Sequence, residues 1–356
     1  MKYKLSDICE YAKEKIKISD LDENTYISTE NMLPNKSGIT QAASLPTQEQ
    51  TQAFMKNDVL VSNIRPYFKK IWFATFDGGC SNDVLVFRAK NGINSRFLHY
   101  VLSDDSFFDY SMATSKGTKM PRGDKKAIME YEVPKLSYEE QSKIASILEV
   151  IDEKIELNSS INKNLEEQAA TLFSENYFNR NYNVSKLEDI ATIKYGKGLP
   201  TKKLTPKGFP VFGGNGVIGK YIHFMYDEPQ ILVSCRGAAS GNIIETYPNS
   251  FVTNNSLVLE WNDYRYYEFY KQFLFANPLH TYATGSAQPQ ITIDNIKNVP
   301  FPCPKYDEIR ELCSQLKSIS ALHFENIVES NKLSMLRDTL LPKLISGELD
   351  VSNLDI

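Results

Sequence analysis

The sequence has few of the residues that metal sites and disulfide frameworks require. Its 356 residues include only four histidines, which are dispersed without the spacing of metal ligands. The five cysteines, at positions 9, 80, 235, 303 and 313, are odd in number and form no Cys-x-x-Cys pair. This usage is typical of free, mostly buried thiols in a reducing compartment. We therefore expect no bound metal and no disulfides.

Long apolar runs are also absent. No stretch approaches about 18 consecutive apolar residues, and the start, Met1 to Lys4, has no apolar segment like that of a signal peptide. This predicts a cytoplasmic chain that does not enter a membrane. The formal net charge is -4, and the acidic excess falls in residues 141–180 and 309–356. The remainder is balanced, so charge neither requires nor excludes a nucleic-acid partner.

Catalytic motifs are missing as well. There is no Gly-x-Ser-x-Gly element and no Asn/Asp-Pro-Pro-Tyr/Phe motif. Gly214 to Gly219 fits a dinucleotide fingerprint, but the aromatic, strand-like residues 221–226 follow it where a phosphate-binding loop needs a helix. We expect no catalytic residue and no cofactor on this chain. The alternative, an enzyme that uses this glycine loop, predicts stabilisation by nucleotides that is lost on Gly216→Val.

The chain repeats itself, and this is its strongest internal signal. Lys4-Leu5-x-Asp7-Ile8 recurs as Lys186-Leu187-x-Asp189-Ile190, and Gly117-x-x-x-Pro121 recurs as Gly285-x-x-x-Pro289. Each half is therefore a variable block of roughly 130 to 140 residues followed by a helical segment.

The helical segments carry apolar residues every seven positions, which is typical of a coiled coil. The rows are Ile144, Ile151, Asn158, Leu165 and Leu172, and then Leu312, Ile319, Asn326, Leu333 and Leu340. Between them stand Ile147, Leu148, Ile155, Ile161 and Ala169, and then Leu316, Leu322 and Leu336. We expect Gly347 to end the second helix.

The order of the parts predicts how the helices pair. The first helix leaves one block and reaches the next, and the second can bury its seam only by running back along the first. Asn158 and Asn326 occupy the middle of their rows. An axis through the centre would place them opposite each other, as a polar pair that fixes the register. A solvated position on the helix edge is the alternative for these asparagines.

These patterns predict an α+β fold: two similar domains of mixed β-sheet and short helices, joined by two long antiparallel coiled-coil helices with pseudo-two-fold symmetry. The predicted parts are residues 1–140, a helix in 141–180, residues 181–308, and a helix with a C-terminal tail in 309–356. Predicted strands are 58–62, 70–74 and 83–87, repeated as 230–234, 242–245 and 256–260. Short helices are predicted at 96–102 and 264–275.

Basic and amide side chains cluster in glycine-containing loops at matching places in the two halves. Lysine and arginine neutralise phosphates, and arginine and glutamine read base edges, so we interpret the clusters as DNA contacts. The candidates are Arg65, Lys69, Lys70, Lys116, Thr118, Lys119, Arg122, Lys125, Lys194, Lys197, Lys202, Lys203, Asn215, Arg236, Ser286, Gln288 and Gln290. For any single lysine, an ordinary solvated loop is the alternative.

The whole chain resembles the specificity subunit of type I restriction–modification systems. The resemblance rests on the repeat, on the long helix after each block, and on short phrases. These are Gly117 to Arg122, Gly213 to Gly216, Gly285 to Gln290, the segment from Val133 to Gln141, and Leu341 to Leu349. One departure is that the second half reads Asp307-Glu308-Ile309 and lacks the glutamine found at Gln141.

The resemblance implies a non-catalytic subunit whose two target-recognition domains each read half of a split, asymmetric site on double-stranded DNA. It implies that the central helices set the spacing and dock two methyltransferase subunits. S-adenosylmethionine and ATP would bind only to partner subunits, and two restriction (translocase) subunits are further partners in the family. The rival interpretation is a tandem-repeat coiled-coil scaffold without a DNA role.

Overall fold

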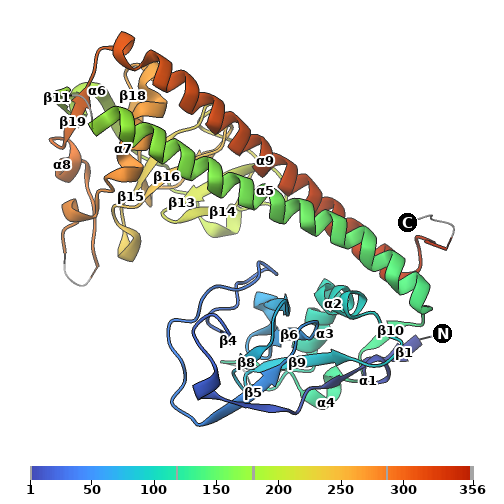
Figure 1. Ribbon diagram of the computed structural model, residues 1–356. Helices are drawn as coiled ribbons and strands as arrows, with labels where there is room; N and C mark the ends of the chain where they lie inside the picture. The colour runs from blue at the N-terminus through green and yellow to red at the C-terminus, as the bar shows by residue number, and fades with distance from the viewer. Residues whose placement is uncertain (1, 118, 179–180, 286–287, 353–356) are drawn as a thin grey trace. The chain divides into compact units, whose positions relative to one another are not determined.

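The structure is a computed structural model that describes residues 2–117, 119–178, 181–285 and 288–352. The chain divides into two compact units, Met1–Glu156 with Ser330–Ile356, and Leu157–Glu329. We call these unit 1 and unit 2. Two long helices, α5 (Tyr138–Phe178) and α9 (Tyr306–Ser346), each contribute one stretch to each unit (Figure 1).

Unit 1 is built on two four-stranded sheets. The first is antiparallel with the order β2-β9-β6-β7, and the second has the order β3-β5-β8-β4. Their strands are β2 (Cys9–Tyr11), β9 (Val84–Ala89), β6 (Val59–Ser62), β7 (Ile71–Phe73), β3 (Lys15–Lys17), β5 (Gln50–Phe54), β8 (Gly78–Cys80) and β4 (Tyr26–Ile27). The other elements are β1 (Lys2–Lys4), β10 (Glu132–Pro134), α1 (Leu5–Ile8), α2 (Ser95–Ser103), α3 (Asp105–Ala113), α4 (Lys125–Ile128), η1 (Ile18–Asp20) and η2 (Pro66–Phe68).

Unit 2 repeats the first of these sheets. Its antiparallel order β12-β18-β15-β16 is the counterpart of β2-β9-β6-β7. The strands are β12 (Ala191–Tyr195), β18 (Ser256–Trp261), β15 (Ile231–Ser234) and β16 (Ile243–Glu245), with a second sheet of β14 (Gly216–Tyr221), β13 (Phe209–Gly213) and β17 (Phe251–Val252). The other elements are β11 (Asn183–Lys186), β19 (Pro300–Cys303), α6 (Leu187–Ile190), α7 (Tyr267–Ala276), α8 (Ile293–Ile296), η3 (Thr201–Lys203), η4 (Gly237–Ala239), η5 (Tyr264–Tyr266) and η6 (His280–Tyr282).

The α+β fold class is confirmed, and all six predicted strands and both short helices are present to within a few residues. The predicted block boundaries stay a prediction. The two units have the same main sheet, as the sequence repeat requires. The glycine motif at Gly214 leads into strand β14, so it lacks the helix that a phosphate-binding loop needs.

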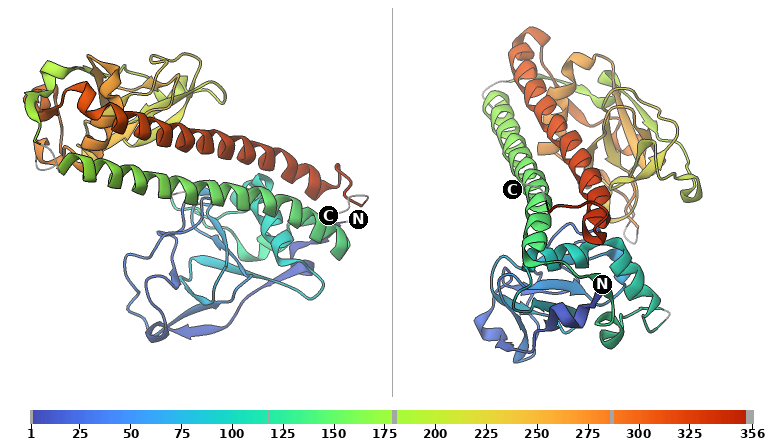
Figure 2. Two further views of the ribbon diagram at one scale, coloured as in Figure 1. Left: turned by 45° about the horizontal axis from the view of Figure 1, so that its top comes forward. Right: turned by 90° about the vertical axis from the view of Figure 1, so that its right-hand side faces the viewer.

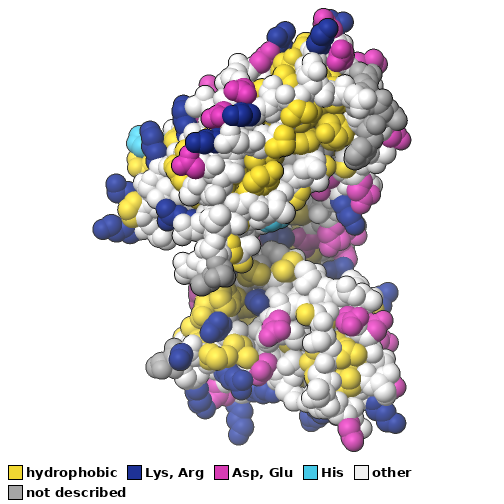
Figure 3. All heavy atoms as spheres, turned by 90° about the vertical axis from the view of Figure 1, so that its left-hand side faces the viewer, with side chains coloured by type: hydrophobic (Ala, Val, Ile, Leu, Met, Phe, Trp, Pro, Cys, Tyr) yellow, Lys and Arg dark blue, Asp and Glu magenta, His cyan; other side chains and the backbone are white. Residues whose placement is uncertain are grey.

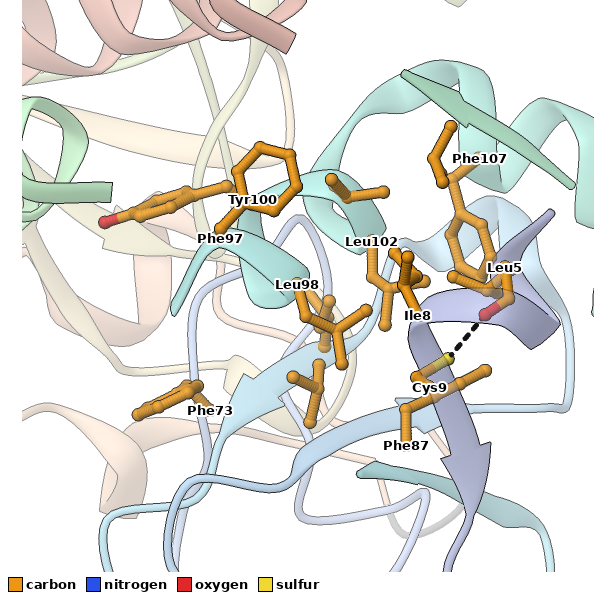
Figure 4. Close-up of a cluster of buried hydrophobic side chains, with 14 of the residues drawn as sticks. Leu5, Ile8, Cys9, Phe73, Phe87, Phe97, Leu98, Tyr100, Leu102 and Phe107 are labelled. Carbon is orange, nitrogen blue, oxygen red and sulfur yellow. Dashed lines mark hydrogen bonds between the residues drawn. The ribbon is translucent and has the colours of Figure 1, made fainter. Parts of the chain in front are cut away.

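The core of unit 1 forms where short helices cover the main sheet. Phe97, Leu98 and Leu102 of α2 pack with Leu5 of α1 and Phe87 of β9, all of them buried (Figure 4). With Val101, which is also buried in this cluster, the spacings of three (Leu98 to Val101) and four (Phe97 to Val101, Leu98 to Leu102) are those of one helix face, which explains why α2 is a helix in this position. At the start of β2 the Cys9 thiol donates to the Leu5 carbonyl over 3.3 Å.

Each unit contains an antiparallel stretch of the long helices (Figures 1 and 2). In unit 1 the Arg337 guanidinium binds Asp152 at 2.8 Å. In unit 2 His323 Nε2 lies 3.0 Å from Glu166 Oε1. Within unit 2, Asn158 and Glu166 of α5 bind Glu329 and His323 of α9, so residue numbers fall along α9 as they rise along α5. Within unit 1, Lys143 and Asp152 contact Ser352 and Arg337 in the same sense. The predicted antiparallel pairing is therefore present in each unit. Gly347, with a φ of +76°, directly follows the end of α9 as expected.

The predicted contact between Asn158 and Asn326 is wrong. Asn158 Nδ2 donates to Glu329 Oε2 at 2.8 Å, and Asn326 Nδ2 donates to Asn162 Oδ1, also at 2.8 Å. The partners are thus shifted by about one helical turn from those predicted. Both asparagines still hydrogen-bond across the helix pair, and their role in fixing its register stays a prediction.

Three residues predicted for the apolar seam are exposed instead. Ile161, Leu322 and Leu336 have 37%, 53% and 48% of their surface accessible. The physical reason is that a straight helix of 3.6 residues per turn drifts away from a seven-residue repeat. α9 therefore presents polar side chains such as His323 and Arg337 to α5 in place of the predicted leucines.

Each variable block is fastened to a long helix of its own unit by polar contacts. In unit 1 the Tyr100 hydroxyl of α2 donates to Asp152 of α5 at 2.8 Å. In unit 2 the buried ammonium of Lys271 of α7 lies 2.7 Å from Glu268 and donates to the Ser320 hydroxyl of α9 at 2.6 Å. These contacts hold each block against the helix that carries it.

Candidate nucleic-acid interface

In unit 1, two loops that are distant in the sequence pair with each other. Ile64 and Arg122 form an antiparallel bridge, and Arg122 also bridges Lys116 within its own loop. The Arg65 amide donates to the Pro121 carbonyl at 2.8 Å, and the Gly123 amide donates to the Asn63 carbonyl at 3.3 Å. The loop after β6 and the loop after α3 are therefore held together by main-chain hydrogen bonds.

Unit 2 pairs its equivalent loops through the same backbone contacts. Gln290 bridges both Arg236 and Thr284. The Gly237 amide donates to the Pro289 carbonyl at 3.0 Å, and the Ile291 amide donates to the Cys235 carbonyl at 3.1 Å. We call the loops 62–70 and 115–125 of unit 1, and 234–240 and 284–291 of unit 2, the paired loops.

The correspondence extends to backbone conformation. Gly117 and Gly285, each in the short hairpin of its paired loops, have φ angles of +91° and +94°. Only glycine adopts this conformation without a steric cost, so the repeated Gly-x-x-x-Pro phrase has a direct structural cause. The two units thus share one loop framework and differ in the side chains that it presents.

Arg65 has an unusual backbone for an arginine. Its φ is +50°, in the left-handed region, and its counterpart in unit 2 is Gly237 with a φ of +74°. The Nε atom of Arg65 is enclosed and has no hydrogen-bond partner among the described residues. A strained backbone and an enclosed side-chain atom without a hydrogen-bond partner are features that functional sites accumulate.

The cations of the unit 1 paired loops are oriented by carboxylates. Arg122 lies 3.1 Å from Asp83, with 56% of the arginine side chain exposed. Lys116 lies 2.5 Å from Asp124 and is 81% exposed. The hydrogen bond from Lys116, joined by the α4 amides of Lys126 and Ala127, holds the pKa of Asp124 down at about 2. These exposed cations remain accessible to a polyanion.

Two predicted contacts of unit 1 are used inside the unit. Lys69 binds Asp105 at 2.8 Å, and Lys70 donates to the Thr29 carbonyl at 2.7 Å. Burial lowers the pKa of Lys70. Lys119 and Lys125 are exposed. Thr118 lies outside the described residues.

In unit 2 the predicted residues divide into two groups. Arg236, Gln288 and Gln290 are exposed on the paired loops, where Ser286 lies outside the described residues. The second group is spread over other elements: Lys194 of β12 binds Glu260 at 2.6 Å, Lys197 follows that strand, Lys202 and Lys203 lie in η3, and Asn215 occupies the turn between β13 and β14. The structure does not bring this second group into the paired loops.

Sequence reasoning missed the residues that support the paired loops. A methyl group added at Gly123 would lie 2.8 Å from Asn63 Oδ1, Ser111 Oγ and Ile128 Cδ1, so only glycine allows the loops to approach. Asp83 and Asp124 were missed because carboxylates rarely mark a DNA surface. Comparison of the two halves could not have identified Gly123, because the equivalent position in the second half is Ile291 and the glycine is not repeated.

Gln141, the residue absent from the second half, has a structural role. It is buried, its Oε1 accepts from the Asn94 amide at 3.0 Å, and its Nε2 donates to the Leu136 carbonyl at 3.0 Å. Its counterpart Ile309 is buried in the core of unit 2. The second half therefore replaces the buried hydrogen bonds of Gln141 with the apolar core packing of Ile309.

Over the described part of the chain, no group of three or more His, Cys, Asp or Glu side chains is arranged to hold a metal ion. Nor does any helix within those ranges have the length and apolarity to cross a membrane. On the face drawn in Figure 3, each unit carries basic and acidic side chains interspersed.

The comparison with known families decides the assignment. The model described as "Type I restriction modification DNA specificity domain" matches residues 1–167 and again 179–332. This chain belongs to that family.

Its relatives agree. It is 24% identical to the type I restriction enzyme MjaIX specificity subunit of Methanocaldococcus jannaschii over 74% of this chain and 71% of the relative. It is 22% identical to the type I restriction enzyme MjaVIII specificity subunit of the same organism, in a match that covers 99% of this chain and 93% of the relative. The fold is similar to that of the type I restriction–modification system S subunit from M. genitalium, with a TM-score of 0.58 and 19% sequence identity. The match covers 97% of this chain and 96% of that subunit.

Proposed function

We propose that this chain is the DNA-reading specificity subunit of a type I restriction–modification complex. It reads a split, asymmetric target on double-stranded DNA, with one unit for each half. One observation carries this function: the paired loops have the same backbone framework in both units but different side chains. A duplicated framework with altered contacts is what two related readers of different half-sites require.

The chain performs no catalysis in this proposal. S-adenosylmethionine and ATP bind to partner subunits, and no metal is needed here. The partners are two methyltransferase subunits and, where the system also cleaves, two restriction subunits. The complex acts in the cytoplasm, where its DNA target lies.

The long helices supply the docking surface for the methyltransferases in this proposal. In unit 1, Val150, Met335 and Leu336 are 64%, 66% and 48% exposed, and in unit 2 Leu157 and Leu322 are 52% and 53% exposed. These exposed apolar side chains, on helices that already pair with each other, support a further protein contact.

The test is to select DNA duplexes from a random library with the purified complex of this chain and its methyltransferase. We expect enrichment of a motif with two specified halves and an unspecified gap. Arg65→Glu combined with Arg122→Glu should abolish enrichment, whereas Lys56→Glu, an exposed residue at the other end of β6, should leave it intact. If the charge-reversed complex enriches the same motif as strongly as the wild-type complex, the result would support the rival interpretation, a coiled-coil scaffold without a DNA role.

A further inference from the structure

Arg122 and Gln290 occupy the same position in the paired loops of the two units. Each is the central residue of a three-stranded contact, with backbone bridges on both sides: Arg122 to Ile64 and Lys116, and Gln290 to Arg236 and Thr284. Both side chains are exposed. Backbone bridges on two sides thus fix the main chain at this position, and its side chain is exposed where a ligand can reach it.

The hydrogen bonds beside these residues also match. Arg122 exchanges two with Lys116, amide to carbonyl at 3.0 and 2.9 Å, and Gln290 exchanges two with Thr284, both at 2.8 Å. The Pro before each of them accepts from an amide of the other loop: Pro121 from Arg65 and Pro289 from Gly237. A side chain that reads bases has to be held by such a rigid backbone, because misplacement by about 1 Å removes its selectivity.

The two side chains are those with the best-defined base partners. An arginine guanidinium donates two parallel hydrogen bonds to O6 and N7 of guanine, and a glutamine amide pairs with N6 and N7 of adenine in the major groove. The nearby lysines are single-point donors on flexible stems and suit phosphates.

Arg122 is further oriented by Asp83. The carboxylate lies 3.1 Å from Nη2 of Arg122, and the Asp83 carbonyl accepts the Asn63 amide at 2.8 Å. One edge of the guanidinium is therefore held by a residue that is itself tied to the paired loops. The remaining N–H groups are left for a ligand, in the planar geometry that guanine needs.

We propose that Arg122 and Gln290 are equivalent base-reading residues, so that the half-site of unit 1 contains a guanine where that of unit 2 contains an adenine. This inference rests on the proposed function and adds to it the identity of one base pair in each half. It also assigns each half-site to its unit.

The test exchanges the two side chains. Arg122→Gln, Gln290→Arg and the wild-type chain are each co-expressed with the methyltransferase in a host without DNA methylation, and the modified motifs are sequenced. Arg122→Gln should change one half only, with guanine at one position replaced or relaxed by about 10- to 100-fold in preference. Gln290→Arg should change one adenine position in the other half only.

Two controls separate base reading from phosphate binding. Lys119→Gln, in the same exposed loop, should lower methylation of all sites together without changing the motif. Arg122→Lys keeps the charge but loses the bidentate geometry, so it should relax the same guanine position.

The results also separate this inference from the proposed function. If the wild-type chain directs methylation but both exchanges leave its motif unchanged, or lower methylation uniformly, the base assignment is wrong and the proposed function stands. If the wild-type chain directs none, the proposed function itself fails. Because Gln290 is exposed, its exchange should not disturb folding, and it decides the question if Arg122→Gln does not assemble.

Discussion

Arg65 and Gly237 occupy the same backbone position in the two units, and both have left-handed φ angles, +50° and +74°. The left-handed conformation costs a non-glycine residue about 1–2 kcal/mol. Unit 2 meets this requirement with glycine, and unit 1 keeps an arginine whose Nε has no partner among the described residues. The strain points to a contact that is made only with a ligand.

Arg65→Gly should therefore separate stability from function. We expect its free energy of unfolding to stay within about 1 kcal/mol of the wild type, because relief of strain offsets the greater entropy of the unfolded glycine. The enrichment of the target motif by the complex with its methyltransferase should be clearly lower than with the wild-type chain. The measurements are denaturant unfolding and duplex selection on the same preparation.

Gly237→Ala is the matched control. No atom lies within 4 Å of the added methyl group, so only backbone strain acts, and we expect a loss of about 1 kcal/mol. A large loss of stability in Arg65→Gly, comparable to removal of a core residue, would show that Arg65 is held by packing and not kept for DNA.

The buried cluster around Lys271 predicts a large effect on stability. Lys271 and Glu268 have only 3% and 12% of their side chains exposed. Lys271→Met leaves a buried carboxylate without its cation, which should lower the free energy of unfolding by about 3–5 kcal/mol. Adding Glu268→Gln should recover much of that loss, since the only carboxylate of the cluster that then stays charged is Glu245, whose side chain is 29% exposed. If the double variant is no more stable than the single one, the ion pair does not account for the effect.

The helix pair gives a prediction about charge. Asn158 is fully buried and donates to Glu329 over 2.8 Å. Asn158→Asp places a second carboxylate against the first, and we expect it to cost more stability than Asn158→Ala, which should cost about 1–3 kcal/mol. Thermal unfolding of the three proteins checks the order. Equal values for Asp and Ala would contradict the observed contact.

His99 predicts a pH dependence. Burial, with smaller contributions from the nearby Arg96 and Arg337, lowers the pKa of His99 from 6.5 to about 3. Between these values the unfolded state binds a proton that the folded state excludes, so this residue lowers stability progressively as pH falls from 6.5 toward 3 and has no effect above.

His99→Phe should reduce that dependence, because a phenyl ring preserves the edge contact with Phe73 and cannot titrate. The free energy of unfolding of both proteins is measured at about pH 7 and about pH 5. His223→Phe, at an exposed position, is the control and should leave the slope unchanged. An unchanged slope in His99→Phe would mean that another group causes the acid sensitivity.

Much of the fold could be predicted because each strand carries its own signal. Apolar β-branched runs such as Val59 to Val61 and Ile231 to Val233 stand between turn residues, and they recur at a constant offset. The second sheet of unit 1 was missed. Its strand β5 is Gln-Thr-Gln-Ala-Phe, whose alternation is too weak to distinguish it from a loop.

The candidate site was only partly predictable. Matching loops in the two halves led to Arg65, Arg122 and Gln290, and the structure pairs those loops. Lys194, Lys202 and Lys203 were included because they stand in or near a glycine-containing stretch, and they lie on β12 and η3, away from the paired loops. Composition cannot distinguish a lysine on a loop framework from one on a strand, because that difference depends on backbone pairing between distant segments.

The central claim is tested most directly by co-expressing this chain with its methyltransferase in a methylation-free host and sequencing every modified base. The account predicts adenine methylation within one split, asymmetric motif, and none when this chain is omitted. Methylation at the same sites without this chain, or a soluble complex that modifies no specific sequence, would contradict it.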